Sequence, residues 1–209
     1  MPKPLLGEQY SDLEQQDGAL QFGMWVFLGS ELLLFSALFA LYASYRSMYP
    51  ADFEQAIRHN TLVYGTANLY LLLTSSLCAA LAVWAMRRGR PRLTLGLLAT
   101  TIVMGLGFLV IKGAEYLVHI REGALPGRYY HWHELPSFGA NRFYSLYWVM
   151  TGLHALHVTA GLCVLGWLSL RVMKGAYSVE HHAGLEMGTL YWHLVDIVWI
   201  FLWPLLYLS

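Results

Sequence analysis

The C-terminal segment of the chain is an apolar run that is long enough to cross a lipid bilayer and that still carries ionisable residues. Within residues 183–208, Glu186, His193 and Asp196 interrupt an otherwise hydrophobic sequence. An ionised carboxylate at the middle of a bilayer costs roughly 3 kcal/mol even on lenient insertion scales, so such groups normally face protein, water or a lipid headgroup. With Thr189, they recur at spacings of three and four, on one stripe of a helix. This stripe needs a partner in the folded protein.

The composition extends this membrane interpretation to the whole chain. Hydrophobic residues make up 57% of the 209 residues and charged residues 12%, and the mean hydropathy is +0.45. A soluble domain carries about twice that share of charge. Runs of ~20 apolar residues predict membrane-spanning helices, and the sequence contains five such runs, at 22–45, 62–86, 93–120, 143–172 and 183–208. We therefore expect an all-α polytopic membrane protein, with one domain of five transmembrane helices over residues 22–209.

The ends of these runs predict an orientation. Residues 1–21 are polar and acidic and lack the basic start and apolar centre of a secretory signal, so we expect a cytoplasmic N-terminal lead-in. Basic residues favour the cytoplasmic side. One side of the predicted bundle collects seven of them, Lys3, Arg87, Arg88, Arg90, Arg92, Arg171 and Lys174, and the other side five, Arg46, Arg58, Arg121, Arg128 and Arg142. The N-terminus and the turn at 87–92 are therefore expected in the cytoplasm.

Other ionisable residues lie inside the predicted spans. Glu31 follows residue 22 by nine positions, which at 1.5 Å per residue places it about 14 Å into the bilayer. Glu31 is either a neutral carboxyl group that forms a hydrogen bond with a neighbouring helix, or a group that exchanges protons or contacts lipid. Lys112 and Glu115 are three residues apart, which favours a structural ion pair, with His119 one turn further along the same face.

Two histidines in the fourth span raise the question of a haem. His154 and His157 are three residues apart, but two imidazoles that bind one haem must come from opposite sides, so His193 would have to supply the second ligand. Histidines that form hydrogen bonds between helices are the favoured interpretation. His181, His182 and Glu186 have a spacing that could bind a metal, but they do not complete a ligand shell. We therefore expect no catalytic, cofactor or metal site in this chain.

Two further classes of interaction are disfavoured. Cys78 and Cys163 both fall inside predicted spans, where a free buried thiol is the ordinary state and a structural disulfide is not expected. The formal net charge is zero, so no basic face is available to bind nucleic acid. We expect instead a buried polar network that stabilises the bundle and involves Glu31, His154, His157, Glu186, His193 and Asp196.

Four strings add a resemblance to a known family. They are GMWVFLGSELLLFSALFALY around Glu31, KGAEY at 112–116, FYSLYWVMTGLHALHVTAGL at 143–162, and HHAGLEMGTLYWHLVDIVWIFLWPLLY at 181–207. Together they resemble subunit III of the haem–copper respiratory oxidases, and they cover nearly all of the chain. Many members have seven spans, and this chain resembles the shorter bacterial form that lacks the first two. Glu31 is similar to the buried carbodiimide-reactive glutamate of the family.

The resemblance implies a function in aerobic respiration. It implies a subunit without redox centres in a proton-pumping cytochrome c oxidase, where the partner subunits hold the haem and copper. Oxidase subunits I and II and membrane phospholipid are the implied partners, and the bacterial cytoplasmic membrane is the implied location. The implied roles are to stabilise the catalytic subunit, to bind lipid and to support proton uptake.

Four alternatives remain open from the sequence. The subunit-III-like accessory protein of bacterial nitric oxide reductases shares five spans and a similar C-terminal ending, and a quinol oxidase subunit III would carry the same pattern. A stand-alone haem or quinone redox protein would need His154 or His157 to bind iron together with His193. A proton-coupled transporter is suggested by the buried acids but disfavoured, because the chain has no inverted repeat and no broken helix.

Overall fold

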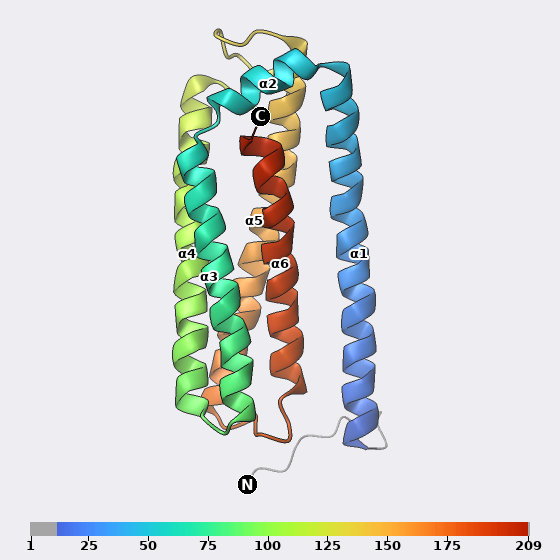
Figure 1. Ribbon diagram of the computed structural model, residues 1–209, viewed down its shortest axis with the longest axis vertical. Coiled ribbons are helices and arrows are strands. Elements are labelled where there is room, and N and C mark those ends of the chain that lie inside the picture. Colours follow the sequence, from blue (N-terminus) through green and yellow to red (C-terminus); the bar gives the residue numbers. More distant parts are fainter. Residues whose placement is uncertain (1–11, 209) are drawn as a thin grey trace.

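The protein is a bundle of five long helices in a computed structural model that describes residues 12–208. The long helices are α1 (Leu13–Met48), α3 (Leu62–Arg87), α4 (Pro91–Glu122), α5 (Phe138–Met173) and α6 (Ala183–Tyr207). All five are long and apolar enough to cross a membrane, which confirms the all-α fold with five spans. Successive long helices run in opposite directions (Figure 1). A short helix, α2 (Pro50–His59), and a 3-10 turn at Gly127–Tyr129 complete the described secondary structure.

Four of the five long helices extend beyond their predicted spans, most of all α1 at its start, whereas α6 ends one residue before its predicted end. Helix α1 begins at Leu13, and its N-cap is Asp12, whose side chain accepts a hydrogen bond from the backbone N–H of Gln15 at 2.7 Å. Part of the segment expected as a polar lead-in over residues 1–21 is therefore helical. Residues 1–11, with Lys3, lie outside the described part of the chain, as does Ser209.

The bundle has two chemically different ends, which we name from their connections. The start of α1, the turn Arg88–Gly89–Arg90 and the loop 174–182 lie at the basic-turn end (Figure 1). Helix α2, the loop 123–137 and the C-terminal end of α6 lie at the α2 end. The tight turn between α3 and α4 requires a left-handed residue, which Gly89 supplies at φ 67°, and Pro91 opens the next helix at a position that needs no backbone donor.

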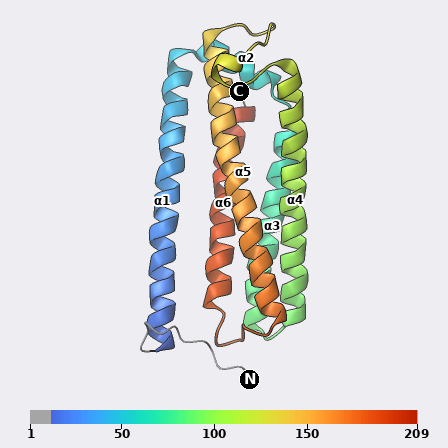
Figure 2. The ribbon, with the colours of Figure 1, turned by 180° about the vertical axis from the view of Figure 1, so that it is seen from behind.

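Helix α1 stands at one side of the bundle. The closely packed pair α3–α4 stands at the other side, with α5 and α6 between (Figures 1 and 2). Among the described elements, α1 contacts α2, α5 and α6 but not α3 or α4. Helices α5 and α6 therefore connect the two sides of the molecule.

Helix α2 was not predicted, because its ten residues are too few for an apolar run that crosses a membrane. Proline is well suited to the first turn of a helix, and Pro50 occupies that position. The helix closes one end of the bundle and buries Phe53, Ala56 and Ile57. The Asp52 carboxylate accepts a hydrogen bond from the backbone N–H of Gly139 at 3.1 Å, which ties α2 to the first turn of α5.

The C-terminal end of α6 is held by side chains from distant parts of the chain. The last carbonyl groups of a helix have no partner within it. The hydroxyl of Tyr42 donates to the carbonyl of Leu205, and Asn60 Nδ2 donates to the carbonyl of Leu206 at 2.8 Å. These two bonds connect the end of α6 to α1 and to the segment after α2.

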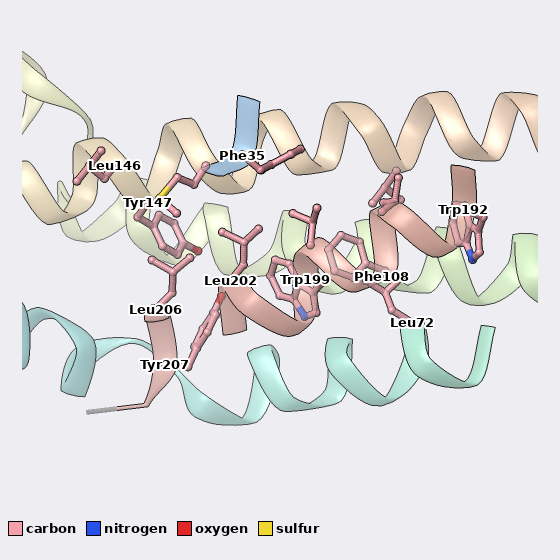
Figure 3. Packing of buried hydrophobic residues seen from close by; sticks show 14 of the residues in the cluster. Phe35, Leu72, Phe108, Leu146, Tyr147, Trp192, Trp199, Leu202, Leu206 and Tyr207 are labelled. Atoms are coloured by element: carbon pink, nitrogen blue, oxygen red, sulfur yellow. The ribbon is translucent and has the colours of Figure 1, made fainter. Parts of the chain in front are cut away.

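Two glycines allow the helices to approach around one large side chain. Trp192 of α6 is fully buried (Figure 3). Its ring lies against Gly105 of α4 and Gly161 of α5. A Cβ atom at Gly105 would lie 2.7 Å from the Trp192 ring, and one at Gly161 would also lie 2.7 Å from it. The indole N–H of Trp192 donates to Ser75 Oγ of α3 at 3.1 Å. One residue thus joins four helices.

This packing predicts opposite effects for two glycine substitutions on α5. Gly161→Ala should destabilise the bundle by about 1–3 kcal/mol, because the rigid indole ring cannot give way by the distance required. Gly166→Ala is the matched control, since a Cβ at Gly166 meets nothing within 4 Å, and it should be neutral or stabilising by up to about 1 kcal/mol. Unfolding of the purified variants in mixed micelles measures both. Equal stability of the two variants would contradict the packing described.

Candidate functional site

A buried cluster of charged and phenolic side chains lies between α4, α5 and α6. Lys112 Nζ lies 3.1 Å from Glu115 Oε2, and the two side chains are only 2% and 1% exposed. Lys112 Nζ also donates to the hydroxyls of Tyr147, at 2.8 Å, and Tyr207, at 2.7 Å. Both hydroxyls in turn donate to Glu115 Oε1, at 2.8 Å and 2.6 Å. In Figure 3 the two tyrosines come from α5 and α6 and point their hydroxyls towards one another.

The geometry of this cluster explains how charges can lie inside an apolar bundle. A buried ion pair is tolerated when further hydrogen bonds satisfy its remaining donors and acceptors. Here the hydroxyls of Tyr147 and Tyr207 supply these further hydrogen bonds, as acceptors for Lys112 and as donors to Glu115. The spacing of Lys112 and Glu115 indicated an ion pair, but Tyr147 and Tyr207 were missed, because they lie 35 and 95 residues from Lys112. Tyrosine in a span gives no signal of its own, since it also packs as an apolar ring.

Glu31 lies against His157 between α1 and α5. Glu31 Oε2 is 2.8 Å from His157 Nε2, and His157 Nδ1 is 2.8 Å from the carbonyl of Leu153. A carbonyl only accepts, so Nδ1 carries a hydrogen. Glu31 and Nε2 then share one proton, and the pair is neutral overall whichever atom holds it. A neutral pair costs far less in the membrane than a lone carboxylate.

His154 has a different environment from His157. Its side chain is fully buried, and neither ring nitrogen has a hydrogen-bond partner among the described residues. The ring stacks on Trp199 with a centroid distance of 5.1 Å and meets the ring of Phe108 edge-on at 5.4 Å. These rings occupy the space beside His154 that a porphyrin would need.

The polar stripe on α6 faces α3. Glu186 Oε1 accepts from Arg87 Nε at 2.9 Å and Nη2 at 2.6 Å, and His182 Nε2 lies 2.9 Å from the same oxygen. His193 Nδ1 and Ser76 Oγ form a hydrogen bond of 2.6 Å. This stripe therefore has a partner in α3.

Asp196 is the exception on the stripe. It is buried, and neither carboxylate oxygen has a hydrogen bond of good geometry among the described residues. The Ser76 side chain lies near the Asp196 carboxylate, but the Ser76 hydroxyl forms its hydrogen bond with His193. The residues expected to form one continuous network thus lie in separate groups: Glu31 with His157, Glu186 with Arg87, His193 with Ser76, and His154 and Asp196 without hydrogen bonds.

Two grooves open beside α6 near the basic-turn end. The first, with a cavity volume of 420 Å³, lies between α1, α5 and α6 and is lined in part by Trp167, Arg171 and Tyr177. The Arg171 guanidinium lies 4.9 Å from the Trp167 ring centre and 5.7 Å from that of Tyr177. Burial raises the pKa of the Tyr177 hydroxyl although Arg171 opposes this effect, so the phenol stays neutral. The groove therefore combines the Arg171 guanidinium and the Asp17 carboxylate with apolar walls.

The second groove, also of 420 Å³, lies between α1, α3 and α6. Trp25 and Trp84 form part of its apolar walls, and the Arg87–Glu186 ion pair also lines it. The two grooves share Met187 of α6. Within residues 12–208, no group of three or more His, Cys, Asp or Glu side chains could hold a metal ion.

The family model and the similar proteins of known name agree on one protein family. The family model for cytochrome c oxidase subunit III matches residues 9–209. A quinol oxidase subunit 3 of Bacillus spizizenii is 29% identical over 200 residues, covering 94% of this chain and 91% of that protein. The cytochrome c oxidase subunit 3 of Synechocystis is 34% identical over 188 residues, covering 90% and 74%. That of Thermostichus vulcanus is 34% identical over 194 residues, covering 89% and 85%.

Proposed function

The chain belongs to the cytochrome c oxidase subunit III family, and we propose that it is a non-catalytic subunit of a bacterial haem–copper terminal oxidase. The observation that carries the proposal is the match over residues 9–209, which includes all five spans and the whole buried polar interior. It is a multi-pass membrane protein. We place it in the bacterial cytoplasmic membrane with its N-terminus in the cytoplasm, because the basic-turn end carries Arg87, Arg88, Arg90 and Arg92.

The side-chain contacts in the interior favour a structural role for this chain over a redox role. Both ring nitrogens of His157 are held, by Glu31 and by the carbonyl of Leu153, and His193 is bonded to Ser76 through Nδ1. His154 lies between aromatic rings. The haem and copper of the oxidase would therefore be held by the partner subunits I and II. In this proposal the chain stabilises the catalytic subunit and supports proton uptake by keeping the assembled enzyme intact during turnover.

Membrane phospholipid is the second class of partner that we propose. The groove between α1, α5 and α6 offers a guanidinium for a phosphate group and apolar walls for acyl chains. Basic residues near a membrane surface contribute about 1 kcal/mol each to the binding of anionic lipid. Arg171 and Lys174 lie together at this end of α5.

The proposal predicts a mild phenotype for Glu31→Gln. The amide keeps a hydrogen bond to His157 but cannot share its proton, so the contact between α1 and α5 should weaken by about 1 kcal/mol. Oxygen reduction by the assembled enzyme should continue, while retention of this subunit during detergent washing and activity over sustained turnover should fall. Glu14→Gln, at an exposed position of the same helix, should change neither. A complete loss of activity in fully assembled Glu31→Gln enzyme would contradict this role.

Co-purification from native membranes tests the function itself. Tagged chain is extracted in a mild detergent, and the associated proteins are identified by mass spectrometry and by their optical spectrum. A haem- and copper-containing oxygen reductase with a copper-binding subunit II would support the proposal. The Bacillus relatives named quinol oxidase subunit 3 favour one second candidate, a quinol oxidase subunit III, which the same experiment would reveal by the absence of a copper-binding subunit II. Recovery of a nitric oxide reductase, or of a coloured protein alone, would overturn the assignment.

A further inference from the structure

A line of titratable side chains connects the buried Lys112–Glu115 cluster to the surface at the α2 end. Glu122, in the last turn of α4, is 39% exposed, and its Oε2 lies 3.5 Å from His119 Nδ1. His119 Nε2 lies 3.8 Å from Glu115 Oε1, and the His119 side chain is only 3% exposed. Exposure thus falls stepwise from Glu122 through His119 to Glu115, which is 1% exposed.

We propose that Glu122 and His119 form a proton-entry route, so that the cluster of Lys112, Glu115, Tyr147 and Tyr207 holds protons that exchange with the aqueous phase at the α2 end. The route runs along one face of α4 from residue 122 to residue 112, which is about 15 Å at 1.5 Å per residue. Beyond it, the four side chains of the cluster are joined by hydrogen bonds of 2.6–3.1 Å. A proton that reaches Glu115 is therefore in contact with all of them.

The two nitrogens of His119 suit it to this step. A proton from water binds the Glu122 carboxylate and passes to His119 Nδ1, and the resulting imidazolium releases its other proton from Nε2 to Glu115 Oε1. One proton leaves the cluster by the reverse path for each that enters, so the net charge does not change. Both gaps exceed the length of a direct hydrogen bond, and a small rotation of the imidazole or a bridging water molecule closes them.

The neighbours of His119 among the described residues include two carboxylates and two phenol rings. From α4 it faces Glu115 and Glu122, and from α5 the rings of Tyr144 and Tyr147, with centroid distances of 5.5 Å and 5.1 Å. Neither of its nitrogens has a hydrogen-bond partner among the described residues, although the side chain is buried. Tyr116, on the neighbouring face of α4, is engaged with Thr151 at 2.8 Å.

The lysine content of the chain allows a direct test. Lys3, Lys112 and Lys174 are its only lysines, so ¹⁵Nζ-lysine labelling of the full chain in lipid bilayers gives three ammonium signals in NMR spectra. Lys174 is exposed and serves as an internal reference. After transfer to D₂O, the rate at which the Lys112 ammonium takes up deuterium measures access to the cluster. Its chemical shift reports at the same time whether the cluster is intact.

The substitutions separate proton transfer from structure. His119→Phe keeps an aromatic ring but no nitrogen, and it should slow exchange at Lys112 by about a hundredfold, the usual contribution of a positioned proton-transfer group. Glu122→Gln, at a half-exposed site where folding is not at risk, should also slow it. His59→Phe is the control, since this histidine lies at the same end on α2 and outside the route. Wild-type exchange at Lys112 in either His119→Phe or Glu122→Gln, or no exchange in the folded wild-type chain, would overturn the proposal.

Discussion

Glu115→Ala should destabilise the protein more than any other single removal of a charge. The substitution leaves the Lys112 ammonium buried without its counter-ion and deprives the hydroxyls of Tyr147 and Tyr207 of their acceptor. Breaking a buried pair from one side costs about 3–5 kcal/mol. We expect this loss in the unfolding of the purified chain, together with a large decrease in the yield of the assembled complex.

Two controls distinguish the cost of leaving the Lys112 charge unpaired from the cost of removing a side-chain contact. The double substitution Lys112→Met with Glu115→Gln removes both charges at similar volume and should recover most of the stability, because a buried pair often breaks even against neutral residues. Glu54→Ala removes one partner of an ion pair whose side chains are 68% and 54% exposed, and it should cost about 0.5 kcal/mol or less. A Glu115→Ala variant as stable as Glu54→Ala would show that the cluster does not carry a buried charge.

Trp192→Ala should have the second large effect, of about 3–5 kcal/mol. Lipid chains are as apolar as a protein interior, so the loss here is one of packing and of the hydrogen bond to Ser75 rather than of transfer from water. The cavity would open between α3, α4, α5 and α6. Unfolding in mixed micelles measures the loss. Trp25→Ala, at a position that is 64% exposed, should change stability little.

A double-mutant cycle tests whether Trp192 acts through the glycines beside it. Gly161→Ala should be costly in the wild-type chain and nearly neutral in the Trp192→Ala background, because the added methyl group then enters the space left by the indole. The coupling between the two positions should therefore be about as large as the cost of Gly161→Ala alone. Additive effects would mean that Gly161 is required for another reason.

The sequence was sufficient to predict the helices that cross the membrane. Their length and hydropathy are local properties, and all five were identified. Helix α2 has ten residues and an amphipathic pattern, so no hydropathy criterion for a span finds it, and its function as a lid over the bundle depends on where Phe53 and Ile57 pack. Its first residue is Pro50, and the effect of proline at the start of a helix is opposite to its effect in the middle.

The polar interior was predictable only in part, for a geometric reason. Residues three or four apart on one helix can be paired from spacing, as for Lys112 and Glu115. Residues on different helices cannot be paired, because spacing gives the face of a helix but not its neighbour. His154 and His157 illustrate this limit: a three-residue offset turns them about 60° apart, enough to direct one towards Trp199 and the other towards Glu31 of α1.

The position of α1 has a consequence for the biosynthesis of the chain. Ribosomes deliver helices to the membrane in order, yet α1 packs against α5 and α6, which are made last, and has no contact with α3 or α4 among the described residues. Helix α1 therefore lies in the membrane without its packing partners while the α3–α4 hairpin is made, and Glu31 lacks its partner His157 during this time. The hydrogen bond from the Tyr42 hydroxyl to the carbonyl of Leu205 forms only after α6 has been synthesised. Termination of translation before α5 would release the α3–α4 hairpin and leave α1 without its partner helices, so the assembly of α1 depends on the segment 138–207.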